Sequence, residues 1–172
     1  MDKTNQAAEI IEQAIFRLGE NTLRIKKCLN ELNEEEIWRK PNNSSNSIGN
    51  LILHLCGNIT QYVISSLGEK DDNRNRDLEF TIASGYNKSE LLKKLTETLD
   101  EAILTLKNLN EKDLLKVQSV QCFNYSGIGI IIHVVEHYSY HTGQITFWTK
   151  LLMDKDLGFY ANVDLNKKNK IG

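Results

Sequence analysis

The 172-residue chain has little of several features that mark common protein classes. It has a single proline and only three cysteines, which are widely spaced and form no C-x-x-C pair. This odd number argues against a disulfide framework or a cysteine zinc knuckle, so we expect reduced thiols in a cytoplasmic protein. The first thirty residues are polar and charged throughout, and we therefore expect no secretory leader.

Charge and long apolar runs are also scarce. The net charge is −2, so nothing global would attract nucleic acid or an anionic membrane. No run approaches the roughly 18 apolar residues of a membrane span. Neither a glycine-rich phosphate loop nor a G-x-S-x-G motif is present, which leaves nucleotide hydrolysis and serine chemistry without support. We expect a small-molecule partner, with no nucleic acid and no membrane.

What the chain does have is helical periodicity, while strand-like alternation is nearly absent. Hydrophobic residues make up 40% of the sequence, enough for the core of one domain. We predict an all-α four-helix bundle with long crossover connections over residues 1–153, followed by a weakly ordered or docked tail over residues 154–172. The four predicted helices span about 5–32, 47–67, 87–109 and 130–152.

Local signals define several helix ends. Asn46 or Ser47 can cap the second helix, and Asn87 with Glu90 resembles a capping box. Gly68 fits just past the end of the second helix. The segment 33–46 is interpreted as a turn and loop, and 69–85 as a charged connection. Arg74, Arg76 and Glu79 could lock this connection in place, but solvated side chains are the favoured interpretation. Between 110 and 126 the helical pattern dissolves, and we expect only a short extended piece near Val117, Val120 and Phe123.

All four histidines lie on two of the predicted helices, His54 on the second and the other three on the last. The apolar stripe of the last helix, continued from Val134 to Ile145, passes through His137 and His141. A buried imidazole without a partner would destabilise the fold by about 1–3 kcal/mol. A metal ion shared between two imidazoles is one such partner.

Spacing alone leaves more than one metal-binding pair. Histidines four residues apart on a helix point to the same side, as in H-E-x-x-H zinc sites. Either His133 with His137 or His137 with His141 satisfies this spacing, and the stripe mildly favours the second pair. His133 and His141 are about 12 Å apart along the helix and cannot share an ion. Hydrogen bonds without any metal remain the alternative interpretation.

Several motifs carry a resemblance to a known family. These are His54 in the run 47–55, the run His137-Tyr-Ser-Tyr-His141-Thr-Gly-Gln144, and the segments 38–41, 57–61 and 74–80. Together they are similar to the DinB/YfiT-like superfamily of metal-binding four-helix bundles, in an uncharacterised branch. The resemblance implies that His54, His137 and His141 bind a divalent metal. Zinc and nickel are the favoured ions, and manganese and iron are compatible.

The resemblance also implies what the centre would do. Some relatives transfer a low-molecular-weight thiol to an electrophile, and others are described as hydrolases, so the expected protein is a metal-dependent enzyme of one of these types. A non-catalytic, stress-associated metal-binding dimer is the alternative. Family members commonly form dimers, and a homodimer is expected here too.

Neighbouring side chains complete the hypothesis. Four polar residues lie within one or two helical turns of the predicted ligands and could orient the imidazoles or a substrate, although ordinary interhelical hydrogen bonding is the favoured interpretation: Asn58, Gln61, Tyr62 and Gln144. Glu136 points about 100° away from His137 around the helix and is interpreted as a surface carboxylate. Cys56 is interpreted as a buried small hydrophobe.

Overall fold

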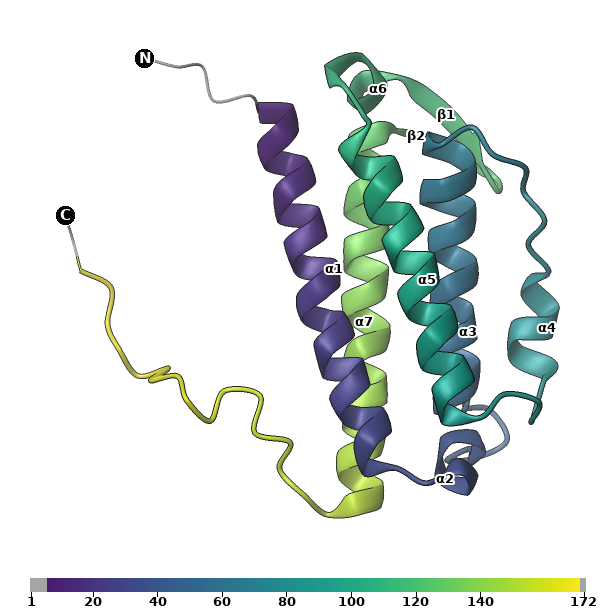
Figure 1. Cartoon of the computed structure of the whole chain (residues 1–172), viewed down its shortest axis with the longest axis vertical. Helices are drawn as coiled ribbons and strands as arrows, with labels where there is room; N and C mark the ends of the chain where they lie inside the picture. The colour runs from purple at the N-terminus through teal and green to yellow at the C-terminus, as the bar shows by residue number, and fades with distance from the viewer. Residues whose placement is uncertain (1–5, 171–172) are drawn as a thin grey trace.

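The structure is a computed structural model that describes residues 6–170. Its four long helices form a bundle (Figure 1), so the all-α prediction is confirmed. They are α1 (Gln6–Glu31), α3 (Ile48–Ile59), α5 (Lys88–Lys107) and α7 (Gly127–Met153). The predicted helix start at Asn5 lies outside the described residues. Among those residues, no helix combines the length and the apolar character that crossing a bilayer requires.

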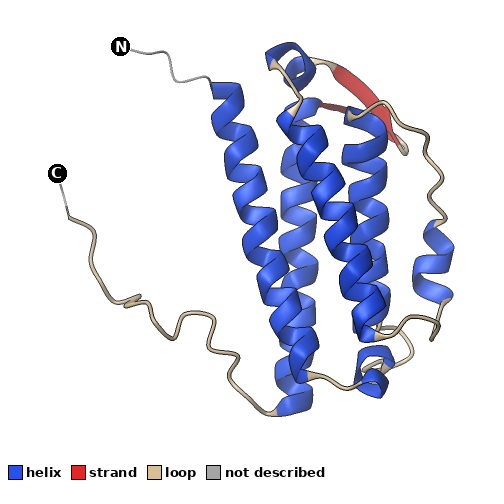
Figure 2. Ribbon diagram, viewed as in Figure 1, coloured by secondary structure: helices blue, strands red, loops and turns tan. Residues whose placement is uncertain are grey.

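The connections carry the remaining elements (Figure 2). These are the short helices α2 (Glu34–Trp38), α4 (Arg76–Thr81) and α6 (Glu111–Leu115), the π-helix η1 (Thr60–Leu67), and the strands β1 (Val117–Val120) and β2 (Phe123–Ser126). The two strands pair antiparallel, with Val117 opposite Ser126 and Val120 opposite Phe123. The extended piece expected near Val117 is therefore one strand of a hairpin.

Each long helix packs against two others: α1 against α5 and α7, and α3 against the same two. α3 and α5 run in the same direction, so the segment 68–87 has to return along the length of the bundle (Figure 1). Within this return segment α4 packs on α3. The topology thus places a polar connection beside the helix that carries His54.

The ends of the helices follow the sequence signals. Ser47 caps α3 and forms a capping box with Asn50, and Asn87 forms the predicted box with Glu90. Gly68 follows η1, and its N–H donates to the carbonyl of Val63, five residues earlier. The second predicted helix therefore ends where expected, but its last eight residues are π-helical.

Two of the connections are more regular than predicted. The segment expected to be a turn contains α2, which Asn33 caps in a box with Glu36. The charged connection contains α4, capped by the side chain of Asn75. Helices this short show no apolar periodicity, so only their capping residues could have signalled them.

The buried face of α7 differs from the predicted one. Tyr138 and Thr142 occupy the core, while His137 and His141 are half-buried at its edge. The prediction that the apolar stripe passes through these two histidines is therefore wrong by one residue. Tyr138 can be buried because its hydroxyl bonds to that of Thr22 on α1 at 2.7 Å, and Thr142 donates to the Tyr138 carbonyl.

The start of the tail after α7 packs against α1. Leu157 is buried, and Phe159 packs against the core. Arg24 of α1 lies over the rings of Phe159 and Tyr160 and donates to the Tyr160 hydroxyl at 2.8 Å. Residues 161–170 are exposed.

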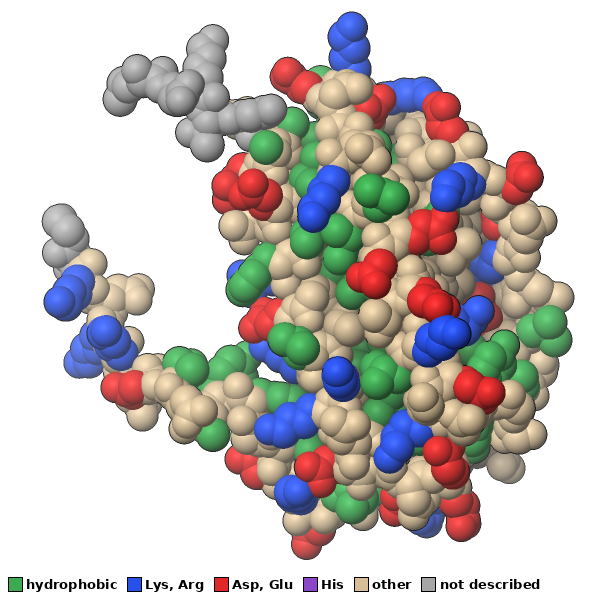
Figure 3. Space-filling view, viewed as in Figure 1, with side chains coloured by type: hydrophobic (Ala, Val, Ile, Leu, Met, Phe, Trp, Pro, Cys, Tyr) green, Lys and Arg blue, Asp and Glu red, His purple; other side chains and the backbone are tan. Residues whose placement is uncertain are grey.

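The surface shows no patch of one charge sign on the face drawn in Figure 3, where acidic and basic side chains alternate. This mixture fits the small net charge of the chain.

Candidate metal centre

Three histidines converge between α3 and α7. The Nε2 atom of His137 lies 3.0 Å from that of His54 and 3.2 Å from that of His141. One ring nitrogen from each of the three residues lies within 4.8 Å of the other two. His137 and His141 are one turn apart on α7, and His54 faces them from the adjacent helix. The structure thus brings together the three histidines that the resemblance implies.

These distances fit a shared ion. Two imidazole nitrogens that bind the same zinc ion at about 2.0–2.1 Å lie roughly 3 to 3.4 Å apart. The two shortest nitrogen–nitrogen distances, 3.0 and 3.2 Å, lie in this range. The third pair of nitrogens, from His54 and His141, lies within 4.8 Å. Ligation itself stays a prediction, as does the identity of the metal.

The outer ring nitrogens decide which inner nitrogens carry lone pairs. His54 Nδ1 faces Glu79 Oε2 at 2.8 Å, and His141 Nδ1 faces Gln144 Oε1 at 2.7 Å. Arg74 Nη2 also lies 3.2 Å from His54 Nδ1, but the Glu79 carboxylate is nearer and can only accept. We therefore assign the proton to both Nδ1 atoms, which leaves both Nε2 atoms bare. The Nε2–H of His137 could donate to only one of them. A cation satisfies all three nitrogens at once, which favours a metal over hydrogen bonds alone.

Glu79 positions His54 from the return segment. Its side chain is 8% exposed, and Arg74, 3% exposed, donates to it from Nε at 2.7 Å and from Nη2 at 2.8 Å. The expectation that the charged side chains of this connection are solvated is therefore wrong for these two. Burial alone would raise the pKa of Glu79, but hydrogen bonds from Arg74 and His54 outweigh it and lower that pKa.

Two α3 residues let the return segment come this close. A Cβ atom at Gly57 would overlap Glu79 Oε1 and lie 2.9 Å from Arg74 Nε. The buried amide of Asn50 donates to the carbonyls of Glu79 and Ile82 at 2.9 and 2.7 Å. The glycine provides space and the amide fixes the backbone of α4, so the Glu79 carboxylate is held against His54.

Burial keeps the α7 histidines neutral. Burial, reinforced by the neighbouring histidines and Arg74, lowers the pKa of His137 to about 3. Burial also lowers the pKa of His141, although the hydrogen bond to Gln144 opposes this shift. Neutral imidazole is the form that binds metals. Among the described residues, the buried Nδ1 of His137 has no hydrogen-bond partner.

The other predicted neighbours have different partners. Gln144 bonds directly to His141, whereas Gln61 accepts from Arg74 Nη1 at 2.9 Å. Asn58 and Tyr62 contact His133 instead, the amide at 3.4 Å and the phenol ring stacked at a centroid distance of 4.3 Å. His133 is thus a packing residue outside the three-nitrogen cluster. Glu136 is exposed and Cys56 is buried, as interpreted from the sequence.

The sequence favours solvation of Arg74 and Glu79 over a role in locking the loop, so their burial against His54 is not predicted. The segment is part of the resemblance, but nothing in its periodicity indicates burial. The available signal was a carboxylate and a guanidinium in a segment that matched the family beside the histidines. Phe80, whose ring lies 4.7 Å from that of His54, was missed for the same reason.

Comparison with solved structures finds the same fold in three bacterial proteins. A DinB-like protein from Bacillus cereus ATCC 10987 aligns with a TM-score of 0.66 at 15% identity, covering 82% of this chain and 91% of its own. One from Bacillus subtilis gives 0.66 at 15% identity, with 86% and 96% covered. A conserved protein from Enterococcus faecalis gives 0.65 at 16% identity, with 90% and 99% covered.

Comparison with curated proteins gives no match. The family model described as "Protein of unknown function (DUF1572)" matches residues 5–162. These residues include the whole bundle and every residue of the three-histidine cluster. The chain therefore has the DinB-like fold expected from its sequence and belongs to the DUF1572 family.

Proposed function

We propose that this protein is a metal-dependent enzyme in which His54, His137 and His141 hold one divalent cation, with zinc or nickel favoured and manganese or iron compatible. The observation that carries the proposal is the convergence of three Nε2 atoms, two of them left as bare acceptors by Glu79 and Gln144. Three nitrogen ligands leave positions for water or substrate, which is typical of catalytic sites.

The reaction that we propose is transfer of a low-molecular-weight thiol to an electrophilic carbon. The thiol loses its proton to solvent, its sulfur forms a bond to the carbon, and the leaving group departs with the electron pair of the broken bond. A bound cation would supply the positive charge that favours thiolate over thiol at neutral pH.

The residues of the chain prepare the site for this reaction. Glu79 and Gln144 fix the orientation of two imidazoles, and the buried Arg74 fixes Glu79. Phe80 and Tyr140 flank the histidines, with ring centroids 4.7 Å from His54 and 5.0 Å from His141. Their rings offer an apolar edge to a substrate.

Metal content and turnover test the proposal. We expect close to one equivalent of zinc or nickel by mass spectrometry of protein grown with both metals. His54→Ala and His141→Ala should each lower occupancy at least about tenfold, while His133→Ala, the matched control, should retain it. Equal loss in His133→Ala would show that the ligand set is wrong.

Activity is then measured with a panel of cellular thiols and an activated aryl halide. Metal-dependent thioether formation that is lost in His141→Ala supports the transferase. Metal binding without thioether formation, but with hydrolysis of ester or amide substrates, would replace it with the hydrolase. If chelation only lowers the melting temperature, the metal is structural and the non-catalytic dimer is the better description.

We also propose that the protein is a homodimer that associates through the groove between α1 and α7. This groove, about 480 Å³ in volume, is lined by apolar side chains with a few polar or charged residues among them: Ile10, Ala14, Ile128, Ile131, Ile132 and Val135, with Glu9, Gln13, Arg17 and Glu136. Ile132 is 58% exposed although it is large and apolar. Contiguous apolar surface of this kind is typical of protein interfaces.

A further inference from the structure

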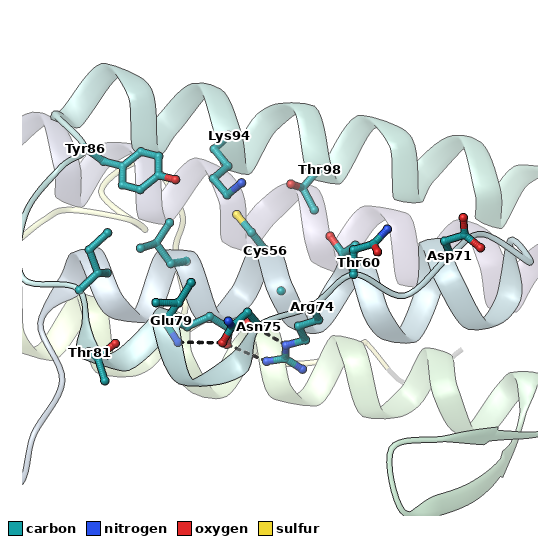
Figure 4. Close-up of a pocket in the computed structure, with 15 residues that line it drawn as sticks. Cys56, Thr60, Asp71, Arg74, Asn75, Glu79, Thr81, Tyr86, Lys94 and Thr98 are labelled. Atoms are coloured by element: carbon teal, nitrogen blue, oxygen red, sulfur yellow. Dashed lines mark hydrogen bonds and ion pairs between the residues drawn. The ribbon is translucent and has the colours of Figure 1, made fainter.

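A cavity lies beside the Arg74–Glu79 ion pair that contacts His54. It has a volume of about 530 Å³ and opens between α3, α5 and the return segment that contains α4 (Figure 4). Because Glu79 and Arg74 form part of its wall, the cavity and the three histidines lie on either side of the same ion pair. We call it the α4 cavity. Its size is in the range of pockets that hold small organic ligands.

The lining of the α4 cavity combines apolar walls with a few convergent polar groups. Leu53, Leu78 and Ile82 provide apolar surface. Figure 4 shows the hydroxyl of Tyr86 and the amino group of Lys94 directed into the same space, with Thr98 beside them and Cys56 beneath. Among the described residues, the half-buried Tyr86 has no hydrogen bond from its hydroxyl, and Lys94, which is exposed to solvent at the mouth of the cavity, has no ion-pair partner.

This charge distribution selects the class of ligand. The charge of Arg74 is already balanced by Glu79, so Lys94 is the cation that remains available. The acidic side chain of Asp71 lies at the opposite end of the cavity from Tyr86 (Figure 4) and would repel an anion there. An anionic group would therefore bind at the end formed by Lys94 and Tyr86, where an ammonium and a hydroxyl can both donate to it.

We propose that the α4 cavity binds a small organic carboxylate with an apolar body, and that its occupancy strengthens metal binding through Arg74 and Glu79. The second half rests on the proposed metal centre. A ligand packed against the ion pair would hold Glu79 against His54, and by linkage a bound metal would in turn favour the ligand.

The first experiment measures binding to metal-free protein by calorimetry with 4-phenylbutanoate and its uncharged analogue 4-phenylbutan-1-ol. We expect the carboxylate to bind at least about tenfold more tightly than the alcohol, since a charge-assisted contact contributes about 1.5–3 kcal/mol, which converts to tenfold or more. Lys94→Gln should abolish this difference. Lys93→Gln, whose lysine pairs with Glu97 and does not line the cavity, should preserve it.

Three results would overturn the binding site. They are equal affinity for acid and alcohol, an unchanged preference in Lys94→Gln, and no saturable binding up to about 10 mM. Thr98→Trp provides a second check, because an indole at this half-buried position fills the cavity and should abolish binding of both compounds. Circular dichroism tests whether Thr98→Trp folds. If it does not fold, the comparison of Lys94→Gln with Lys93→Gln still tests the binding site.

The second experiment measures zinc affinity by competition with a chromophoric chelator, with and without saturating 4-phenylbutanoate. We expect at least about fivefold tighter zinc binding with the carboxylate present, and no change in Lys94→Gln. An effect that persists in Lys94→Gln would place the carboxylate on the metal itself and overturn the coupling, as would an unchanged zinc affinity. Carboxylate binding by a protein that binds no zinc would remove the metal centre but leave the cavity ligand in place.

Discussion

At the scale of single residues, the geometry of His54 depends on Glu79. The carboxylate fixes the protonated nitrogen of the ring and is itself held by two donors of Arg74. We predict that Glu79→Gln lowers zinc affinity about 10- to 100-fold, the range typical for residues that orient a metal-ligating histidine. The metal-free variant should also lose stability, because the buried Arg74 would lack its charge partner.

Asp77→Asn is the control for this prediction, since it removes a carboxylate from the exposed side of the same short helix. Its zinc affinity, measured by chelator competition, should equal that of the unmodified protein. Comparable losses in both variants would assign the effect to the overall charge of α4 and not to the contact with His54.

Burial of the histidines makes the metal-free protein sensitive to mild acid. The pKa values of His133, His137 and His141 are all lowered, that of His137 to about 3. As pH falls below about 6.5 the unfolded chain takes up protons that the folded chain does not, so stability decreases. The lowered pKa of Glu79 adds a further loss below about 4.5, where the unfolded carboxylate becomes protonated.

Urea unfolding at pH 7.5, 6.5 and 5.5, with chelator present, measures this dependence. We expect the midpoint concentration of urea to change little between pH 7.5 and 6.5 and to fall between 6.5 and 5.5. His137→Asn should flatten this fall because it removes the histidine with the lowest pKa. The same slope in the variant and the parent would show that other groups control acid sensitivity.

The sequence identified the candidate ligands but not the residues that orient them. The H-x-x-x-H spacing is local and could be recognised directly, but it left His133/His137 and His137/His141 both open. The family resemblance selected the second pair and implied His54. The contact of His54 with Glu79 joins residues 25 positions apart and depends on how the return segment folds back. No periodicity of α3 or of segment 69–85 encodes that distance, so the carboxylate could not be predicted from pattern alone.

At the scale of elements, three helical glycines differ in the space that surrounds them: two lie in open space and one is in close contact with a neighbouring side chain. A Cβ atom at Gly19 of α1 or Gly143 of α7 would meet nothing within 4 Å, whereas at Gly57 of α3 it would lie 2.7 Å from Glu79 Cδ. We predict that Gly19→Ala and Gly143→Ala each stabilise the protein by about 0.5–1 kcal/mol, because alanine has the higher helix propensity.

Gly57→Ala should instead destabilise the protein and weaken zinc binding, since α4 would have to move away from His54. Thermal unfolding and chelator competition on the three variants measure both effects. A stabilising Gly57→Ala with unchanged zinc affinity would mean that the return segment is not held in the described position.

The long helices were predicted well because each has many buried apolar residues at the helical period. Ile11, Leu18 and Ile25 of α1 illustrate this regularity. The π-helical turns of η1 were missed because the buried residues Ile59, Val63 and Leu67 are four residues apart, a spacing that also fits an α-helix. Likewise, Thr142 enters the core because its hydroxyl bonds within α7, which hydrophobicity alone does not reveal.

At the scale of the whole molecule, the apolar groove between α1 and α7 predicts self-association. Ile132→Glu would bury a carboxylate in the proposed interface and should convert dimers to monomers at micromolar concentration, as measured by light scattering after gel filtration. Leu104→Glu is the control, because Leu104 is similarly exposed, at 62%, but lies on α5. Dimers that persist in Ile132→Glu would place the interface elsewhere.

The parallel course of α3 and α5 has a consequence for how the protein could release the proposed cation. An extended chain of about nine residues would span the roughly 30 Å length of the twenty-residue helix α5, yet the return segment that makes this connection comprises residues 68–87. Because of this excess length, the return segment can move away from α3 while the four long helices stay packed together. Hydrogen exchange should therefore detect local opening of residues 70–86 far more often than global unfolding. Each such opening would move the Glu79 carboxylate away from His54 and weaken binding of the proposed cation.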